Sequence, residues 1–432
     1  MSDALLHIKD SYYFELPKFL WRSEREGRTD FPEYWVRLDD EYQDWEASEQ
    51  YDFLATKIES GNVVGVELPP KQKLLKAYQS WRHENKNYAK PFDRFLEEAE
   101  GQEWFQKPLA LGEFEKQLDD EEGDAFEARI EAATKFDGNQ DWWGRIKTNA
   151  NDVERFDVET PPWSDEKIES YNHALDGKVL IPQPFGTLRN NYQKESGFAI
   201  SKFMILELVV AAVLVWVFTK LATKVQFGRP VKKKAWNMFE AFLLFLRDEV
   251  ARPAIGGHDA DRFVPLLWTI FMFVLGCNLL GMIPFMGAPT GSFSVTLAMA
   301  GVTFATVVIA GSARFGILGF WKNQVPSMGL PMILAIFIVP MLFLIEVLGL
   351  FIKHAVLGIR LLANMVAGHL VLLAIMGMAV AAAGTSTWPV VAPIAVIGSA
   401  LFSVLELFVA FLQAYVFTFL SALFIGSAVH HH

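Results

Sequence analysis

One apolar stretch, EVLGLFIKHAVLGIRLLANMVAGHLVLL (residues 346–373), contains four ionisable side chains inside what otherwise has the composition of a membrane helix. These side chains are Glu346, Lys353, Arg360 and His369. A charge at the centre of a bilayer costs roughly 2.5–3.5 kcal/mol on insertion scales, so such residues are rarely retained without a role. We therefore expect this stretch to handle charge.

Charged residues divide the chain into two regions of different character. Residues 1–200 contain 25 Lys and Arg against 42 Asp and Glu, whereas residues 201–432 contain 14 against 8. The single cysteine, Cys277, excludes an intrachain disulfide. The first residues lack the pattern of a secretory signal or transit peptide, so we expect them to belong to the mature protein. The composition predicts an acidic soluble region followed by an apolar membrane region.

The acidic region is expected to form a soluble, mostly α-helical, Trp-rich domain over residues 1–157. Apolar residues at spacings of three and four predict short amphipathic helices at 71–81 and 92–105, and alternation at 62–68 predicts a strand. The region has no phosphate-binding loop, dinucleotide fingerprint, nucleophile elbow or paired Cys/His spacing, so its role stays open. The proline-containing polar residues 158–197 predict a linker to the membrane.

Five apolar segments within residues 198–429 are long enough to cross a membrane as helices. The expected spans are residues 198–222, 262–284, 292–313, 331–384 and 387–427. Segment 331–384 either is broken into two spans by Pro340 and the region from Glu346 to Lys353 or forms one long tilted helix, and the same choice applies to 387–427. Between the first two spans, residues 235–252 combine an apolar face with charges, which is typical of a helix lying in the interface. The small residues of 292–313 favour close helix packing.

The distribution of positive charge favours five crossings with two long tilted helices. In that arrangement the inside loops hold 11 Lys and Arg, and the outside turns at 285–291 and 384–388 hold none. This orientation places the C-terminus inside and the acidic region outside. The last three residues, 430–432, are histidines that are either natural or a tag, and we expect no metal site there.

Polar residues form one stripe on each of the two long segments. At 100° per residue, Glu346, Lys353, Arg360 and Asn364 fall within a sector of about 60°, whereas His369 lies well off that face. In the last segment Glu406 and Gln413 repeat at a near-heptad. If Gln413 is level with Arg360, then Glu406 lies about 10 Å further out and Glu346 about 21 Å inward. The stripes then line one path along the two helices.

The order of these groups suits a proton or ion route that is interrupted by a fixed positive charge. Arg360 stays protonated and cannot relay protons, whereas His369 and Glu406 can. Three other interpretations remain open: Arg360 as a structural cation paired with Glu346 or Glu406, His369 as a core histidine, and Lys353 as a snorkelling side chain. For Lys353 the snorkelling interpretation is favoured.

Three segments closely resemble subunit a of rotary F-type ATP synthases, whose motif runs near R-L-F-G-N-M-x-A-G-H. They are NLLGMIPF (278–285), EVLGLFIKHAVLGIRLLANMVAGHLVL (346–372) and ELFVAFLQAYVFTFLSALF (406–424). The resemblance covers about 199–428 and leaves residues 1–195 as an addition. The chain departs from the family pattern at three positions: His354 stands where Pro is usual, Leu362 where Phe is usual and Ala363 where Gly is usual.

The resemblance implies proton translocation through two half-channels between the membrane faces and a c-ring, which couples the proton-motive force to rotation and ATP synthesis. Arg360 would be the stator arginine facing the c-ring carboxylate, with Asn364 and Gln413 as its polar neighbours. Glu346 would be the acid of the inner half-channel, and His369 with Glu406 the pair of the outer one. Some bacterial members exchange the positions of that acid and histidine.

The family also implies a subunit that is not an enzyme by itself and has no cofactor or metal. Its expected partners are the c-ring of small proteolipid subunits, the peripheral stalk, the catalytic head indirectly and the lipid membrane, with no nucleic acid. The expected location is a bacterial inner membrane, or alternatively a mitochondrial inner membrane. A His/Glu pair favours the proton over sodium as the transported ion.

Two alternatives belong to other functional classes. A secondary transporter would use Arg360 to bind an anionic substrate, and it predicts internal repeats and broken helices at the midplane. The two halves of the membrane region show no such repeat. A membrane anchor would leave the working part of the protein in the acidic region.

Overall fold

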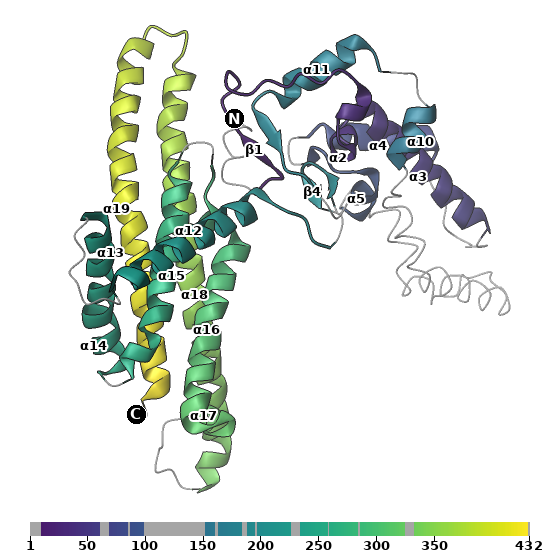
Figure 1. The fold of residues 1–432 in the computed structure, drawn as a ribbon. Coiled ribbons are helices and arrows are strands. Elements are labelled where there is room, and N and C mark those ends of the chain that lie inside the picture. The colour runs from purple at the N-terminus through teal and green to yellow at the C-terminus, as the bar shows by residue number, and fades with distance from the viewer. Residues whose placement is uncertain are drawn as a thin grey trace, which may run out of the picture. The chain divides into compact units, whose positions relative to one another are not determined.

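The computed structural model describes the chain in two compact units. One unit contains Met1–Phe14 and Ser201–His432, here called the membrane unit, and the other is Glu15–Ile200, here called the N-terminal unit. The described residues are 10–60, 69–84, 87–98, 152–159, 163–183, 188–194, 197–225, 234–257, 259–283, 286–324 and 332–430. Figure 1 shows the two units as ribbons.

The membrane unit is built from helices of very different length (Figure 1). In chain order they are α12 Lys202–Val225, α13 Lys234–Phe245, the π-helix η3 Leu246–Ala251, α14 Arg252–Ile255, α15 Ala260–Gly281, the 3₁₀ helix η4 Pro289–Gly291, α16 Phe293–Phe315, α17 Ile317–Lys322, α18 Met332–Ala381 and α19 Trp388–Val429. Five of these described helices, α12, α15, α16, α18 and α19, are long and apolar enough to cross a membrane. The prediction of a helical membrane protein with about five crossings is therefore confirmed.

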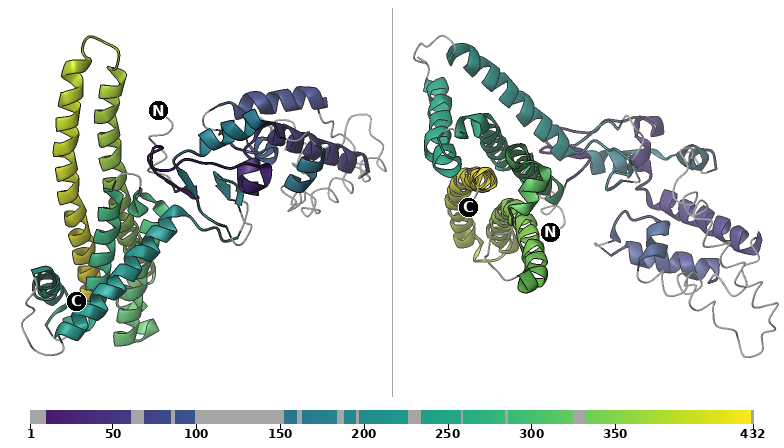
Figure 2. Two further views of the ribbon diagram at one scale, coloured as in Figure 1. Left: turned by 45° about the horizontal axis from the view of Figure 1, so that its top comes forward. Right: turned by 90° about the horizontal axis from the view of Figure 1, so that it is seen from below.

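Helices α18 and α19 are the longest elements and lie side by side as an antiparallel pair, as both views of Figure 2 show. α18 has 50 residues and α19 has 42, which correspond to about 75 Å and about 63 Å. Pro340 and Pro393 lie inside these helices without breaking them. The alternative in which each segment forms two spans is thus wrong, because the apolar runs on both sides of each proline continue one helix.

The core of the membrane unit lies around α15, whose side chains Leu267, Val274 and Cys277 are fully buried. The ring of Trp268 stacks on that of Phe218 from α12, with centroids 4.0 Å apart. α16 packs closely on α18 at Gly358. A Cβ at this position would lie only 2.9 Å from the carbonyl oxygen of Thr296, so the close approach requires glycine here. The small residues of these helices thus permit the close approach that the packing needs.

Residues 235–252, expected to form one interfacial helix, are divided among α13, η3 and the start of α14. In the π-helical turn, Asp248 accepts hydrogen bonds from Arg247 at 2.9 Å and from Arg252 at 2.7 Å. A π-turn inserts an extra residue into the helical repeat. The charged side chains predicted for one face of this segment therefore pair partly with one another.

The N-terminal unit consists of short helices and strands around two small aromatic cores. Its elements are β1 Tyr13–Glu15, which begins in the membrane unit, the 3₁₀ helix η1 Arg28–Asp30, α2 Glu33–Val36, α3 Asp40–Ser60, α4 Lys71–Arg82, α5 Phe92–Glu97, α10 Asp152–Glu159, α11 Asp165–Leu175, β2 Lys178–Leu180, β3 Leu188–Asn190 and β4 Gln193–Lys194. β3 and β4 pair antiparallel, with Leu188 opposite Lys194. One core contains Leu54, Trp81 and Phe92. The other contains the buried residues Phe31, Trp35, Val36, Tyr42, Val153, Phe156 and Leu175.

The helix predicted at 71–81 corresponds to α4, and the one predicted at 92–105 corresponds to α5, which ends at Glu97. The strand predicted at 62–68 lies outside the described residues. Residues 158–197, expected to be a linker, instead contain α11 and three strands. The reason is that α11 has an apolar side: Leu175 is fully buried, and the ring of Tyr171 packs edge-on against Trp163 at 4.6 Å.

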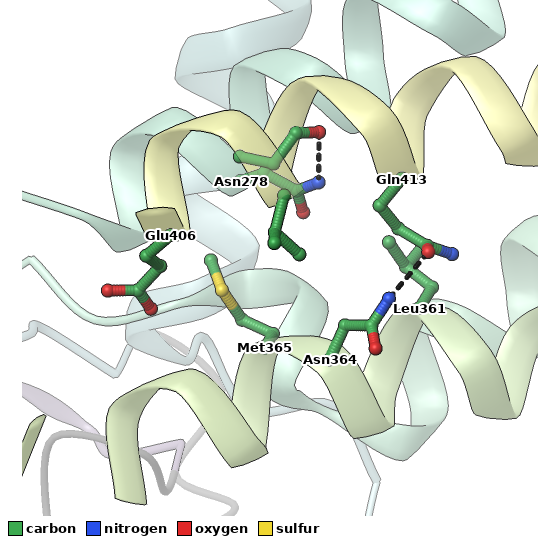
Figure 3. A pocket seen from close by; sticks show the side chains of 8 residues that line it. Asn278, Leu361, Asn364, Met365, Glu406 and Gln413 are labelled. Atoms are coloured by element: carbon green, nitrogen blue, oxygen red, sulfur yellow. Dashed lines mark hydrogen bonds between the residues drawn. The ribbon is translucent and has the colours of Figure 1, made fainter. Parts of the chain in front are cut away.

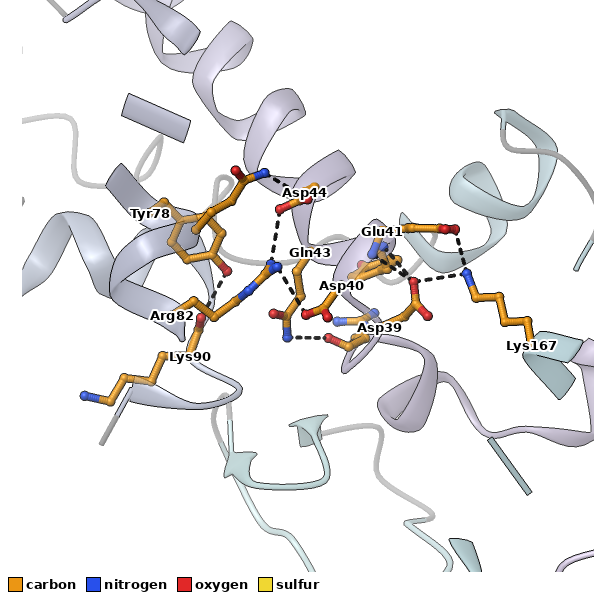
Figure 4. A network of polar contacts seen from close by, with 12 residues as sticks. Asp39, Asp40, Glu41, Gln43, Asp44, Tyr78, Arg82, Lys90 and Lys167 are labelled. Atoms are coloured by element: carbon orange, nitrogen blue, oxygen red, sulfur yellow. Dashed lines mark hydrogen bonds and ion pairs between the residues drawn. The ribbon is translucent and has the colours of Figure 1, made fainter. Parts of the chain in front are cut away.

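Polar contacts also fasten α11 to the start of α3 (Figure 4). The ammonium group of Lys167 lies 3.2 Å from a carboxylate oxygen of Asp39 and 2.6 Å from one of Glu41. A second contact near the start of α3 is the ion pair of Arg82 with Asp44, at 3.2 Å. Residues 163–194 therefore belong to the N-terminal unit as far as the structure describes them.

The chain begins in the membrane unit before it forms the N-terminal unit. A side-chain oxygen of Asp10 accepts a hydrogen bond of 3.1 Å from the backbone N–H of Phe203, and the carbonyl of Ser11 accepts one of 2.8 Å from the N–H of Lys202. These contacts satisfy N–H groups that would otherwise lack partners at the start of α12. Both ends of the N-terminal unit are thus continuous with the start of the first span.

Candidate functional site

Arg360 lies on the exposed face of α18, among exposed apolar side chains such as Val356 and Ile359. Within the described residues its guanidinium makes no hydrogen bond or ion pair. The interpretation of Arg360 as a structural cation paired with Glu346 or Glu406 therefore has no support in this geometry. A cation on an apolar helix face at membrane depth is costly unless something outside the chain compensates it.

One turn further along α18, Asn364 connects this helix to α19. Its Nδ2 donates a hydrogen bond of 2.7 Å to Oε1 of Gln413 (Figure 3). Gln413 is buried, with 2% of its surface exposed, whereas Asn364 is on the exposed face. The helical repeat places Arg360 and Asn364 on one side of α18, so this amide pair lies next to the guanidinium along the helix.

The next polar pair along the two helices is His369 with Glu406. Nδ1 of His369 lies 3.8 Å from Oε1 of Glu406, and both side chains are largely shielded, with 20% and 7% of their surface exposed. Gly368 makes room for the acid, because a Cβ at that position would lie 2.6 Å from Oε1 of Glu406. The helices thus bring together an imidazole and a carboxylate, the two side chains best suited to exchange a proton near neutral pH.

A small pocket lies between Glu406 and the Asn364–Gln413 pair (Figure 3). It is lined by Asn278, Leu361, Asn364, Met365, Glu406, Val409, Ala410 and Gln413. Oε1 of Glu406 and Nε2 of Gln413 are buried without a hydrogen bond to any residue of the described chain. Buried polar atoms of this kind normally bind water. The pocket therefore extends from Glu406 to the Asn364–Gln413 pair and presents two polar atoms that can bind water.

Asn278 is a pocket residue that the sequence analysis did not single out. Its Nδ2 donates to the carbonyl of Ala410 at 3.2 Å, and its Oδ1 accepts a hydrogen bond of 2.8 Å from the hydroxyl of Thr290. These contacts connect α15 and η4 to α19 at Ala410, one turn after Glu406. A signal was present, since Asn278 is the one amide in the apolar NLLGMIPF segment, but its partners lie far away in the sequence.

Glu346 and Lys353 are not part of this group. Glu346 is half-buried on α18, about 21 Å along the helix from Arg360 by its rise. Lys353 is exposed, and neither side chain has an ion-pair partner within the described residues. His354, which stands where the family usually has Pro, is buried with Nδ1 2.8 Å from the carbonyl of Leu350. In the described part of the chain, His, Cys, Asp and Glu form no cluster suited to a metal ion.

Comparison with known families identifies the membrane unit. The family model described as ATP synthase A chain matches residues 203–426, which is more than half of the chain. The chain belongs to the ATP synthase subunit a family. It is therefore a membrane-embedded, non-catalytic subunit of a proton-translocating F-type ATP synthase.

Relatives named ATP synthase subunit a share between a third and a half of their aligned residues with the chain. The protein of Chloroherpeton thalassium is 36% identical over 272 residues, which cover 62% of this chain and 78% of that protein. The protein of Chlorobium phaeobacteroides is 39% identical over 264 residues, covering 60% and 74%. That of Myxococcus xanthus is 42% identical over 199 residues, covering 45% and 62%. Membership of this family establishes a role in ATP synthesis and proton transport as part of a larger complex.

Proposed function

We propose that this subunit a conducts protons through two half-channels between the membrane faces and a ring of small proteolipid subunits. The observation that carries the proposal is the position of Arg360, which has no partner within the described chain and lies beside the Asn364–Gln413 pair on an exposed helix face. A ring carboxylate that passes this face would meet a permanent cation. The carboxylate would then lose its proton there, because an opposite charge favours its ionised form.

The outer half-channel contains His369 and Glu406, and the inner one contains Glu346. The 3.8 Å approach of His369 to Glu406 and the pocket that runs from Glu406 to Gln413 support the outer route. The inner route rests on the place of Glu346 on the same face of α18. Arg360 lies between the two routes and cannot relay protons. A proton therefore passes from one route to the other only when it is bound to a carboxylate of the rotating ring.

The proposal includes the partners and location of the subunit. A c-ring covers the exposed face of α18, peripheral stalk subunits hold the subunit in place, and the catalytic head uses the rotation. The membrane is a bacterial inner membrane, with the N-terminal unit outside and the C-terminus inside, as the distribution of Lys and Arg favours. The continuous helices α18 and α19 differ from the broken helices that a secondary transporter would need.

Removal of the guanidinium tests this function. In the complete complex reconstituted into vesicles, Arg360→Ala should abolish ATP-driven proton pumping, which is measured by quenching of an acidity-sensitive dye. Lys353→Ala is the matched control, because Lys353 is an exposed cation about two turns away on the same helix and should leave pumping intact. Retained pumping in Arg360→Ala, with the ring and catalytic head still copurifying, would show that the proposed mechanism is wrong.

A further inference from the structure

The N-terminal unit exposes a compact apolar patch on the loop formed by residues 16–21, here called the 16–21 loop. Its sequence is LPKFLW, and Leu16, Phe19, Leu20 and Trp21 are all exposed. Phe19 exposes 78% of its surface and Leu20 64%. Single exposed apolar side chains are ordinary, but several adjacent ones mark a surface that contacts something.

Hydrogen bonds hold the loop in shape at its base. The N–H of Leu16 donates to the carbonyl of Gly177 at 2.7 Å, and the N–H of Gly177 donates to the carbonyl of Trp21 at 2.9 Å. A turn closes the tip, where the N–H of Leu20 donates to the carbonyl of Pro17 at 2.8 Å. Gly177 has a φ of +78°, and a Cβ there would lie 2.5 Å from the carbonyl oxygen of Leu16. The backbone therefore presents the apolar tip without burying it.

Chain connectivity keeps this loop close to the membrane. Ser11 is bonded to the first turn of α12, and Phe19 follows it by eight residues, a reach of at most about 27 Å. The apolar span Lys202–Thr223 has 22 residues, or about 33 Å as a helix, which matches a hydrocarbon core of about 30 Å. A membrane boundary close to Lys202 is consistent with this length. Whatever the orientation of the N-terminal unit, the loop therefore lies within that reach of the boundary.

We propose that the 16–21 loop inserts into the lipid interface on the side of the membrane where α12 begins. Trp is enriched at the headgroup level, and Phe and Leu are typical of apolar faces that enter the boundary between headgroups and acyl chains, so Trp21, Phe19 and Leu20 fit this position. Lys18 and Arg22 flank them and are exposed, so their charged ends can contact anionic headgroups while the apolar tip enters the membrane. The insertion gives the N-terminal unit a second attachment to the bilayer besides its chain ends.

Site-directed spin labelling of the full-length chain in vesicles tests the insertion. The single buried Cys277 is first replaced by Ser, and a label is then attached at Phe19→Cys or, as the matched control, at Val158→Cys. Val158 is an apolar residue of α10 with 81% of its surface exposed. In vesicles of phosphatidylcholine and phosphatidylglycerol, the ratio of collisions with oxygen to collisions with an aqueous nickel chelate should be severalfold higher at 19 than at 158.

Two further measurements separate lipid from other occupants. Adding Lys18→Glu and Arg22→Glu to the Phe19→Cys chain should lower the ratio in anionic vesicles, and Leu20→Cys should repeat the result of Phe19→Cys. Equal ratios at 19 and 158 would overturn the proposal. Shielding at 19 that appears only in the complete ATP synthase, and not in the chain alone, would indicate a protein partner and would also overturn it. Neither readout depends on proton transport, so the proposed function is tested separately.

Discussion

Asn364 of α18 and Gln413 of α19 are joined by a hydrogen bond of 2.7 Å between Nδ2 and Oε1. The bond fixes the register of the two long helices one turn from Arg360. Because both helices are continuous, that register also decides which residue of α19 faces His369, and the residue is Glu406. The two polar pairs are therefore consequences of a single alignment of α18 with α19.

Breaking the Asn364–Gln413 bond should cost stability in a way that a double-mutant cycle can isolate. Asn364→Leu leaves the amide of Gln413 buried without its partner, and Gln413→Leu removes the acceptor. Hydrogen bonds between membrane helices contribute about 1 kcal/mol, so we expect a coupling energy of about that size from thermal unfolding in detergent. Fully additive single effects would show that the bond does not fix the register.

Neutralising Glu406 should slow proton flux without affecting assembly. Glu406→Gln keeps the shape of the side chain but removes its proton-accepting carboxylate, and loss of a positioned proton-transfer group costs roughly 10²-fold or more. The rate is measured as proton uptake by vesicles under an imposed potential, and His369→Ala should act in the same direction. Ser403→Ala is the control, because within the described chain the Ser403 hydroxyl hydrogen-bonds only to the carbonyl of Ser399 in α19. Unchanged flux in both variants would remove Glu406 and His369 from the path.

Gly368 provides a test of the position of Glu406 rather than its charge. In Gly368→Ala the new Cβ would meet Oε1 of Glu406 at 2.6 Å, so the carboxylate has to rotate away. A displaced rotamer costs about 1 kcal/mol, and we expect flux through the complex to fall by roughly fivefold. Gly377→Ala adds the same methyl group on the same helix, where within the described chain nothing beyond the adjoining helix backbone lies within 4 Å, and it should have no effect. Equal rates in the two variants would contradict a requirement for this geometry.

Much of the membrane unit could be predicted from the sequence, because the physical signals there are local and strong. A run of apolar residues specifies a span, and the helical repeat specifies which polar residues share a face. Counting residues along two antiparallel helices placed Glu406 near the level of His369, but it also placed His369 off the polar face of its helix, and their pairing was implied only by the family resemblance. Asn278 could not be placed in this way, since its contacts to Ala410 and Thr290 depend on how a third helix packs.

The N-terminal unit was harder to predict because its elements are short and their partners are distant. β2 and β3 have three residues each and β4 has two, too few to show an alternating pattern. The prolines of 158–197 suggested a linker, although Trp163 and Tyr171 pack in a core there. The hydrogen bond between Asp10 and Phe203 connects residues 193 positions apart. Patterns of neighbouring residues in the sequence cannot predict such a contact.

The N-terminal unit also contains a buried ionic cluster that makes its stability sensitive to pH. The guanidinium of Arg189 lies 3.1 Å from a carboxylate oxygen of Glu46 and 2.7 Å from one of Asp93, and all three side chains are nearly inaccessible. Burial is the main cause that raises the pKa of Glu46 to about 7. The nearby charges of Asp93 and Asp152 raise it as well, while those of Arg189 and Arg37 oppose the rise.

The free energy of unfolding of this unit should fall as the pH rises from about 4.5 to about 7. Over that range the unfolded chain releases the proton of Glu46 whereas the folded unit retains it, and the difference amounts to about 3 kcal/mol. Hydrogen exchange of α3 in the full-length protein, corrected for the intrinsic rate, measures this dependence. Glu46→Gln cannot ionise and should flatten it, whereas Glu49→Gln, an exposed carboxylate of the same helix paired with Arg155, should leave it unchanged. Protection that rises with pH in the wild type would show that Glu46 is ionised in the folded unit.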